Sequence, residues 1–393
     1  MVDNTRELHD IRVARVSTVA FFVETQLRSQ IFATAQAGAR VTVIASESGL
    51  SHEIPGTRYL SIEIPRKISL LKDVKALFSL WLLFLREQFQ VVHSTTPKAG
   101  LLCCIAGKLA RVPVRLHTFT GQPWIGMVGI KRLVSKYSDK IIGAFSTHCY
   151  ADSFSQRDFL VEAKIVGQKK ISVLGAGSLA GIDLDRFDPA RFSAEDRLVL
   201  RETLGIPSSA TILLFVGRIT EDKGIFELLD AFEHVNNRIG DVYLLLLGPS
   251  EISTDDLLDG CSERTQERIT LLGFSDEPER YMSIADILVL PSYREGFGTV
   301  VIEAAAMGVP TIGSCIYGLS DAVVDGETGV LVPVKDVGEL AHAIDWMSKN
   351  VPQRLDMGRK ARSRVLEEFS SSRLSELLIS EYVRLLRVNN ECK

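Results

Sequence analysis

Short apolar runs rich in Val, Ile and Leu alternate with longer segments of helical period along nearly the whole chain. Strands covered on both faces are continuous apolar runs, so this alternation predicts parallel sheets flanked by helices. The expected strands of the first half are residues 13–17, 41–45, 91–93, 114–118, 141–144 and 171–174. Those of the second half are residues 212–216, 242–247, 269–272, 287–290, 310–312 and 329–332. The expected fold class is therefore α/β, with two doubly wound parallel sheets.

Predicted helices lie between these strands, for example at residues 25–37, 70–88 and 100–110. A stretch rich in Gly and Asp at residues 175–192 breaks both periods and marks a linker. A chain of 393 residues also exceeds the roughly 250 to 300 at which a single core stops growing. We expect domains at residues 1–185 and 186–370, and a C-terminal helix, 371–393, that crosses back to the first domain. In such sheets ligands bind outside the carboxyl ends of the strands.

Composition is that of a folded soluble protein, with 46% hydrophobic and 24% charged residues. The net charge of -4 hides an asymmetry, because residues 1–185 carry 23 Lys and Arg against 15 Asp and Glu. The first half therefore has a charge of +8 and the remainder -12. This difference suggests different partners for the two halves. No nucleic-acid partner is expected.

Few signals of targeting segments, membrane spans or cysteine patterns are present in the sequence. The N-terminus lacks the features of a signal peptide, and the longest apolar stretch, residues 76–85, is about half of the roughly 20 residues that span a membrane. The cysteines show no metal-ligand spacing, so reduced buried thiols in a cytoplasmic protein are expected. They lie at positions 103, 104, 149, 261, 315 and 392.

The first candidate site is FVGRITEDKG, residues 215–224. Gly217 follows a buried strand, and Arg218 and Lys223 precede the next helix. Two cations beside a helix N-terminus form an anion site, because free N–H groups and the helix dipole add to the side-chain charge. A diphosphate would suit this site. In isolation the same segment is more typical of a solvated surface loop.

The second candidate is PSYREGFGTVVIEAAAMGVP, residues 291–310. Its turn glycines permit close backbone approach to a ligand, and Thr299 begins a helix whose N–H groups point outward. Glu303 follows four residues later on the same helix face and leans back toward that end, while Glu295 lies in the loop. Phosphates would take the N–H groups, and the carboxylates would accept hydrogen bonds from ribose and sugar hydroxyls.

The linked motifs G-R-x-x-x-x-K-G and P-S-x-x-E-G-F-G-x-x-x-x-E-A-x-A-x-G-x-P resemble family 4 glycosyltransferases, which are retaining enzymes of the GT-B fold. Residues 326–332, GETGVLV, also match that pattern. The resemblance covers residues 12–385. Segments of the first half resemble the capsule and O-antigen subgroup of the family. They are HSTTPKAG (residues 93–100), HTFTGQPW (117–124), ADSFSQRDFL (151–160) and GSLAGIDLDRF (177–187).

The resemblance implies a role for each matching residue. Arg218 and Lys223 would grip the donor diphosphate and stabilise the leaving group, and Glu303 would hold the ribose. Glu295, together with the backbone of Gly296, Phe297, Gly298 and Thr299, would hold the donor sugar, and Gly273 and Phe274 would line the base pocket. The donor would be a UDP-sugar and the acceptor a lipid-linked saccharide. Neither a metal nor another cofactor is expected.

This sequence departs from the broader family in one place. Many members have His-Gly after the fourth strand of the first domain, whereas this chain has Thr120-Gly121, with His117 three residues earlier. His117 is therefore either a catalytic residue that contacts the donor sugar or a hydrogen-bonded structural residue. Asp183 and Asp185 form a D-x-D string, but its position in the predicted linker favours a structural role over metal binding.

The segment 66–89 carries Arg66, Lys67, Lys72 and Lys75 at one end and a Trp/Phe/Leu-rich stretch at the other. Such a pattern suits peripheral contact with the anionic cytoplasmic surface of a membrane, although a buried helix with a solvated start would have the same pattern. Two other functions stay open. A UDP-sugar 2-epimerase shares the fold but needs no acceptor, and a non-catalytic sugar-nucleotide-binding protein would turn nothing over.

Overall fold

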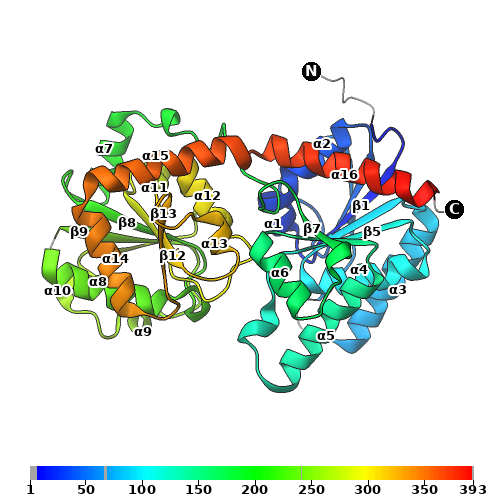
Figure 1. The fold of residues 1–393 in the computed structure, drawn as a ribbon, viewed down its shortest axis with the longest axis horizontal. Coiled ribbons are helices and arrows are strands. Elements are labelled where there is room, and N and C mark those ends of the chain that lie inside the picture. Colours follow the sequence, from blue (N-terminus) through cyan, green and yellow to red (C-terminus); the bar gives the residue numbers. More distant parts are fainter. Residues whose placement is uncertain (1–6, 66–68, 240, 392–393) are drawn as a thin grey trace. The chain divides into compact units, whose positions relative to one another are not determined.

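The computed structural model describes residues 7–65, 69–239 and 241–391, and its chain divides into two compact units (Figure 1). Unit 1 comprises Met1–Gly181 and Ser371–Lys393, and unit 2 comprises Ile182–Ser370. Sequence reasoning placed the first boundary four residues later, at residue 185. The C-terminal segment thus returns to the unit in which the chain began.

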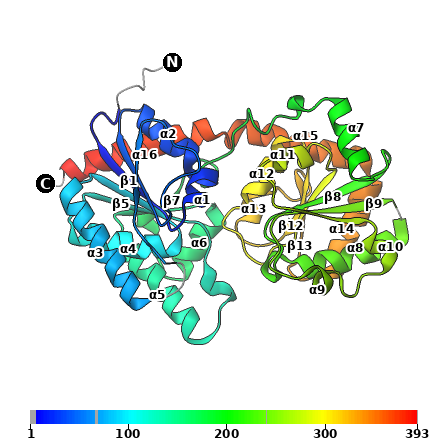
Figure 2. The same cartoon turned by 180° about the vertical axis from the view of Figure 1, so that it is seen from behind.

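Unit 1 contains a seven-stranded parallel sheet in the order β3-β2-β1-β4-β5-β6-β7. Its strands are β1 (Arg12–Val16), β2 (Arg40–Ala45), β3 (Thr57–Ser61), β4 (Val91–Thr95), β5 (Val114–Phe119), β6 (His148–Ala151) and β7 (Ile171–Val173). Its helices are α1 (Ala20–Phe22), α2 (Arg28–Gln36), α3 (Leu70–Glu87), α4 (Pro97–Leu109), α5 (Gly129–Phe145), α6 (Phe154–Glu162) and α16 (Ser371–Glu391). A π-helical turn, Val23–Leu27, joins α1 to α2. Figure 2 shows this sheet from the opposite side.

Unit 2 contains a six-stranded parallel sheet in the order β10-β9-β8-β11-β12-β13. Its strands are β8 (Thr211–Val216), β9 (Val242–Leu247), β10 (Ile269–Gly273), β11 (Ile287–Leu290), β12 (Thr311–Ser314) and β13 (Gly329–Val332). The helices of its first half are α7 (Ala194–Thr203), α8 (Ile225–Ile239), α9 (Thr254–Leu258), α10 (Glu263–Gln266) and α11 (Pro278–Met282). Those of its second half are α12 (Thr299–Ala306), α13 (Leu319–Ala322), α14 (Val337–Lys349) and α15 (Val351–Glu368).

Two sheet neighbours in each unit come from non-consecutive strands. In unit 1 these are β1 and β4, and in unit 2 they are β8 and β11. At such a point the strand order reverses and the following loops diverge, which opens a crevice at the carboxyl ends of the strands. Both candidate motifs of unit 2 directly follow these two strands. The topology therefore places them at the position where a doubly wound sheet binds its ligand.

One predicted strand is wrong. Residues 141–144 belong to α5, because the helical period of the preceding residues continues through them. Ile142 and Gly143 are buried, whereas Ile141 is exposed, which is a helical pattern of burial. Two short strands, β3 and β6, were not predicted. A short apolar run cannot be assigned to helix or strand by periodicity alone, and β3 has a largely polar, half-exposed sequence.

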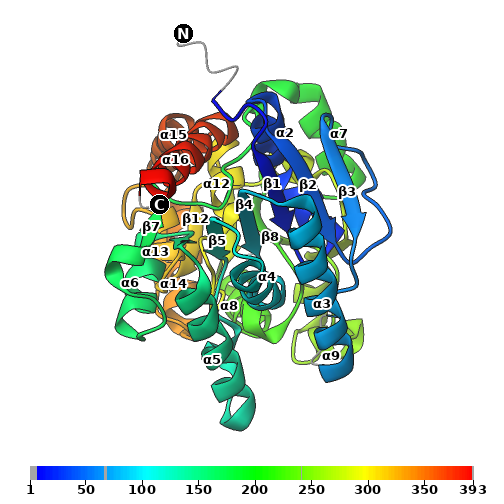
Figure 3. The same ribbon diagram turned by 90° about the vertical axis from the view of Figure 1, so that its right-hand side faces the viewer.

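The C-terminal helix α16 packs against α2 and closes the core of unit 1. Its Tyr382 is fully buried and accepts a hydrogen bond from Arg15 of β1 at 2.9 Å. The same hydroxyl lies 2.7 Å from Nδ1 of His93 on β4. Figure 3 shows α16 lying beside this sheet. The first sheet is thus completed by a segment that lies far away in the sequence.

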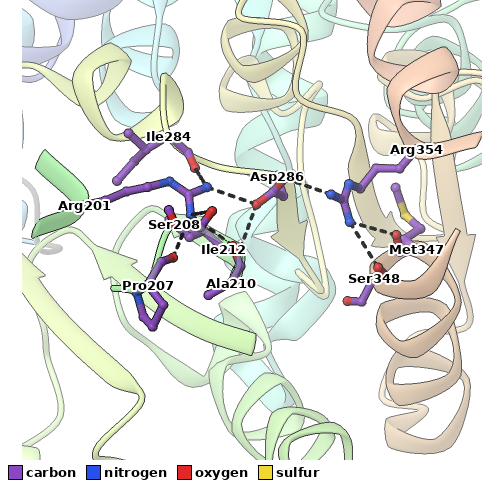
Figure 4. A network of polar contacts seen from close by, with 10 residues as sticks. All are labelled: Arg201, Pro207, Ser208, Ala210, Ile212, Ile284, Asp286, Met347, Ser348 and Arg354. Atoms are coloured by element: carbon purple, nitrogen blue, oxygen red, sulfur yellow. Dashed lines mark hydrogen bonds and ion pairs between the residues drawn. The ribbon is translucent and has the colours of Figure 1, made fainter. Parts of the chain in front are cut away.

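In unit 2 a buried ion-pair network joins α7, β8, α14 and α15 (Figure 4). One carboxylate oxygen of Asp286 accepts from Arg354 at 2.9 Å, and the other accepts from the Ile212 amide at 2.9 Å. Arg201 lies 3.5 Å from the latter oxygen, and Arg354 also donates to the Met347 carbonyl at 3.1 Å. The network lies at the amino end of the central strands. It therefore holds the scaffold together on the side away from the candidate site.

Among the residues that the structure describes, no helix is long and apolar enough to cross a membrane. The thiols of Cys103, Cys104 and Cys149 are buried, as expected, whereas Cys315 is exposed. Cys392 lies outside the described residues, as do Arg66 and Lys67.

Candidate functional site

Glycines join the carboxyl ends of β8, β9 and β10. The amide of Gly217 donates to the Leu247 carbonyl at 2.9 Å, and that of Gly248 donates to Gly273 at 2.7 Å. A Cβ on Gly248 would lie 1.9 Å from the Gly217 carbonyl oxygen, so no side chain fits there. By contrast, a Cβ on Gly217 would meet nothing closer than 3.7 Å. The backbone after β8 is therefore fixed by its contacts with Leu247 and Gly248. There is room beside Gly217 for a ligand to approach.

Gly224 brings the loop after β8 against the loop after β11. Its φ is +70°, and a Cβ would lie 2.1 Å from the carbonyl oxygen of Pro291. The amide of Tyr293 donates to the Asp222 carbonyl at 3.0 Å, and Arg294 forms an ion pair with the Asp222 carboxylate at 3.0 Å. These backbone and side-chain contacts fix the two predicted motifs side by side.

Lys223 and Glu295 meet directly across these two loops. The ammonium nitrogen of Lys223 lies 2.5 Å from Oε1 of Glu295, and both side chains are largely buried. The sequence assigned these residues to two separate motifs, and the structure brings them together. The result is a charge pair at the carboxyl ends of β8 and β11.

Arg218 does not join that pair in this structure. Its guanidinium donates to Oε1 of Glu251 at 2.7 Å, and both side chains are about half exposed. Glu251 follows β9, and its amide donates to the Ile219 carbonyl at 3.2 Å. An exposed ion pair contributes little, about 0 to 1 kcal/mol, so Arg218 can exchange this partner for an anion at small cost.

The N-terminus of α12 begins at an unusual backbone position. Gly298 has a φ of +84° and, as a glycine, has no side chain with which to cap the helix. Gly318, with a φ of +86°, lies against the same turn, and a Cβ there would be 2.7 Å from the Gly296 carbonyl oxygen. Sequence analysis singled out Gly296, Gly298 and Thr299 but missed Gly318. Its only signal was a glycine in the loop that follows β12.

The two phenylalanines of the predicted site differ in exposure. Phe297 is 2% exposed and its ring packs against Phe369 at 5.3 Å between centroids. Its side chain therefore anchors the turn in the core, and the role expected of Phe297 falls to its backbone. Phe274, directly after Gly273, is exposed. It alone of the two offers an aromatic surface to solvent.

Glu303 lies on α12, four residues after Thr299, and part of its side chain remains accessible. Removal of the carboxyl group from water raises its pKa to about 7, and the nearby Glu279 carboxylate acts in the same direction. Arg186 opposes this effect, but its guanidinium is already paired with Glu279 at 2.8 Å. Positive charge therefore stabilises the Glu303 carboxylate only weakly. The carboxylate can accept hydrogen bonds from a ligand.

In unit 1, His117 is buried and 1% exposed. Its Nδ1 lies 3.0 Å from Oγ of Ser94, and its ring packs edge-on against Phe119. Burial lowers its pKa to about 3, so the imidazole is neutral. A Cβ on Gly100 would lie 2.4 Å from its ring, which shows how closely α4 covers it. The buried ring and its partners within unit 1 favour the structural of the two roles expected for His117.

Polar residues of the first-half motifs also lie at the carboxyl edge of the first sheet. Thr96 has a φ of +69°, which is strained for a β-branched residue, and its hydroxyl lies 2.8 Å from that of Thr18. Asp152, directly after β6, is 5% exposed, and burial raises its pKa well above the usual range. These groups follow β1, β4 and β6. Thr96 and Asp152 belong to the segments HSTTPKAG and ADSFSQRDFL, which the sequence already indicated.

The D-x-D string serves the linker. Oδ1 of Asp183 accepts from the amides of Asp185 and Arg186 at 3.0 and 3.1 Å, which is the geometry of a local turn. Within the part of the chain that the structure describes, no group of three or more His, Cys, Asp or Glu side chains could hold a metal ion.

Two doubly wound parallel sheets, one of which carries paired charges and a glycine-preceded helix N-terminus at its switch point, define the GT-B class of fold. Comparison with known proteins supports the same class of fold. The family described as glycosyl transferases group 1 matches residues 196–364, and the glycosyl transferase 4-like domain matches residues 23–177. Sucrose-phosphate synthase from Thermosynechococcus elongatus superposes with a TM-score of 0.78 at 22% identity, over 96% of this chain and 100% of that one.

Two bacterial enzymes are similar over most of their length. The capsular polysaccharide biosynthesis glycosyltransferase CapM of Staphylococcus aureus is 32% identical, over 83% of this chain and 85% of the relative. A UDP-Gal:α-D-GlcNAc-diphosphoundecaprenol α-1,3-galactosyltransferase of Escherichia coli is 27% identical, over 84% of this chain and 85% of the relative. The chain belongs to glycosyltransferase family 4 and is a glycosyltransferase.

Proposed function

We propose that this glycosyltransferase moves a sugar from a UDP-sugar to a hydroxyl of a polyprenyl-diphosphate-linked saccharide, with retention of anomeric configuration. The product would be part of a surface polysaccharide such as a capsule or O-antigen. The names of the two bacterial relatives support this assignment, since one acts in capsule synthesis and the other uses UDP-Gal and a lipid-linked acceptor. The sugar transferred would be a hexose or an N-acetylhexosamine.

The observation that carries the proposal is the Lys223–Glu295 pair at the switch point of the second sheet. In the proposed complex the Lys223 ammonium neutralises charge that develops on the departing diphosphate. Such fixed charges are effective because they need no reorganisation during the reaction. Glu295 would then accept hydrogen bonds from the donor sugar. Arg218 would exchange Glu251 for a phosphate oxygen.

Glu303 and the end of α12 would complete the donor site. The Glu303 carboxylate would accept hydrogen bonds from ribose hydroxyls, and the N-terminus of α12 would face a phosphate or sugar oxygen. Gly217 and Gly273 would allow close backbone approach, and Phe274 would lie against the base. No metal or other cofactor is part of the proposed reaction.

The proposed transfer step needs no general base from the protein. The acceptor oxygen attacks the anomeric carbon on the face from which the diphosphate leaves, and the bond from that carbon to the phosphate oxygen breaks. The freed phosphate oxygen takes the proton of the acceptor hydroxyl. Lys223 and Arg218 stabilise the negative charge that remains. The enzyme would act in the cytoplasm, at the membrane that holds its acceptor.

The test is a panel of UDP- and GDP-sugars incubated with lipid-linked saccharides in detergent, with products analysed by mass and anomeric configuration. We expect a product with the donor's configuration from a UDP-sugar, and only when the acceptor is present. Conversion of a UDP-sugar without acceptor would support a 2-epimerase instead. Binding of UDP-sugars without turnover under any condition would indicate a non-catalytic protein. An inverted product would contradict the proposed mechanism.

A further inference from the structure

The N-terminal part of α5 carries apolar side chains that are exposed among the described residues. Val128 and Ile130 are 84% and 79% exposed, and the next turns continue the pattern. The additional exposed apolar residues of this helix are Leu133, Val134 and Tyr137. The buried residues of α5 are Asp139, Ile142 and Gly143, all in its second half. Figure 3 shows α5 extending beyond its neighbours at the lower edge of the unit.

The second half of α5 anchors the helix firmly. Asp139 accepts a hydrogen bond from the Trp124 indole at 2.7 Å, and a Cβ on Gly143 would lie 2.5 Å from the Ile165 carbonyl oxygen. The exposed first half is therefore held in place by a rigid base. Contiguous exposed apolar surface of this kind marks an interaction site, because it is unfavourable in water.

Positive charge is interleaved with the apolar side chains. Lys131, Arg132, Lys136 and Lys140 all lie on α5, and residues 127–145 contain a single acid, the buried Asp139. Cations in the first helical turn oppose the helix dipole, and α5 has two there with no acid to offset them. The charge complements an anionic surface, and the apolar side chains complement lipid.

Helix α3 repeats the arrangement in the same unit. Its first turns expose Leu70, Leu71 and Val74, whereas its buried residues, Ala76, Leu80 and Phe84, begin later. Helix α4 lies between α3 and α5 and contacts both. Because each helix crosses back from the carboxyl end of a parallel strand, both exposed N-terminal ends lie at the carboxyl edge of the first sheet.

We propose that the exposed N-terminal turns of α5, with those of α3, form a docking surface for an anionic lipid bilayer. Residues Val128, Ile130, Leu133 and Val134 enter the boundary between head groups and acyl chains, while Lys131 and Arg132 contact lipid phosphates. The inference rests on the proposed function in one respect, since a polyprenyl-linked acceptor is held in a membrane. Docking here brings the carboxyl edge of the first sheet toward that acceptor.

The test measures binding of the full chain to sedimented vesicles, without donor or acceptor. One set of vesicles contains phosphatidylglycerol and phosphatidylethanolamine, and the other contains phosphatidylcholine alone. We expect binding to the anionic set that weakens as salt rises. At about 1 kcal/mol for each cation near the surface, K131E/R132E should bind at least about 30-fold more weakly. I130S/L133S should lose about tenfold or more, because the inserted apolar area is removed.

Matched controls lie in unit 2. L198S/V199S removes two exposed apolar side chains from α7, and R359E/K360E reverses two exposed charges on α15. Both should bind anionic vesicles as the unsubstituted chain does. All four variants should keep the thermal unfolding temperature, because the replaced side chains are exposed.

Equal binding by the α5 variants and the controls would overturn the proposal, as would equal binding to both vesicle types. A dimer in solution that I130S/L133S dissociates, without vesicle binding, would also overturn it and identify a contact between two copies. The proposed function is tested separately, because transfer in detergent does not require docking. Loss of vesicle binding with normal transfer in detergent would support the docking surface and leave the function intact.

Discussion

The Lys223 ammonium and the Glu295 carboxylate lie 2.5 Å apart, so the two residues with the largest proposed roles in donor binding neutralise each other in this structure. They come from loops after β8 and β11, which only the reversal of strand order brings together. A donor diphosphate would therefore compete with Glu295 for Lys223. The pair holds the Lys223 side chain against the loop after β11.

Lys223→Ala should lower kcat/KM for transfer by about 100- to 1000-fold, because removal of one preorganised charge at a developing anion has that effect. The measurement is initial rate against donor concentration with a lipid-linked acceptor. Lys349→Ala is the matched control, since Lys349 is also ion-paired, at 2.8 Å to Asp345, but lies on α14. Wild-type kinetics in Lys223→Ala would remove this lysine from the mechanism.

Glu251→Gln should lower KM for the donor by about two- to fivefold and leave kcat nearly unchanged, because it frees Arg218 from an exposed pair worth at most about 1 kcal/mol. The gain should shrink at high salt, where the pair is already screened. Donor titrations at low and high ionic strength test this. A higher donor KM in the variant would show that Glu251 itself contributes to binding.

Glu303→Gln should stabilise the fold at pH 8 and have little effect at pH 4.5. The pKa of Glu303 is raised to about 7, so between pH 4.5 and 7 the folded state holds a proton that the unfolded state has lost. Stability from this group is therefore present below pH 4.5 and is lost as pH rises to 7, by up to about 3 kcal/mol. Chemical denaturation at both pH values measures the difference.

The same Glu303→Gln variant should bind the donor more weakly, because the amide offers ribose one acceptor oxygen instead of two. A variant that is less stable than wild type at pH 8 would contradict the raised pKa of Glu303. One that is more stable but equally active would contradict the proposed ribose contact. The two conclusions can thus fail separately.

His117→Asn should leave the pH dependence of kcat between pH 6 and 9 unchanged, since burial lowers the pKa of His117 to about 3 and the ring is neutral throughout. Loss of packing against Phe119 should reduce the free energy of unfolding by about 1 to 3 kcal/mol. Rate profiles and thermal unfolding measure these effects. If one limb of the pH–rate profile disappeared in the variant, His117 would be a residue that takes part in proton transfer.

Asp286→Ala should lower the free energy of unfolding by about 3 to 5 kcal/mol, because it leaves the buried Arg354 and the half-buried Arg201 without their shared carboxylate. Asp356→Ala is the control, since Asp356 pairs with Arg359 and Lys360 at the surface. It should change stability by less than about 0.5 kcal/mol. Similar losses of stability in both variants would show that the Asp286 network contributes no more than a surface ion pair.

Much of this molecule was predictable because its strands are buried on both faces. Every expected strand except residues 141–144 forms, and Lys223 and Glu295 were assigned to the site from their motifs alone. What could not be predicted depends on three-dimensional packing. The direction of the Phe297 ring is set by Phe369, the pairing of Arg218 by Glu251, and the burial of His117 by Gly100. None of these partners is near in sequence.

The return of α16 to the first sheet has a consequence for synthesis on the ribosome. Residues 182–370 form a continuous insertion within unit 1, so unit 2 is complete before Tyr382 leaves the exit tunnel. Until then Arg15 and His93 lack their shared hydroxyl partner, and the α2 surface that α16 covers stays exposed. The unit that is begun first is therefore the last to finish folding, and nascent chains that stop short of α16 should be substrates for chaperones.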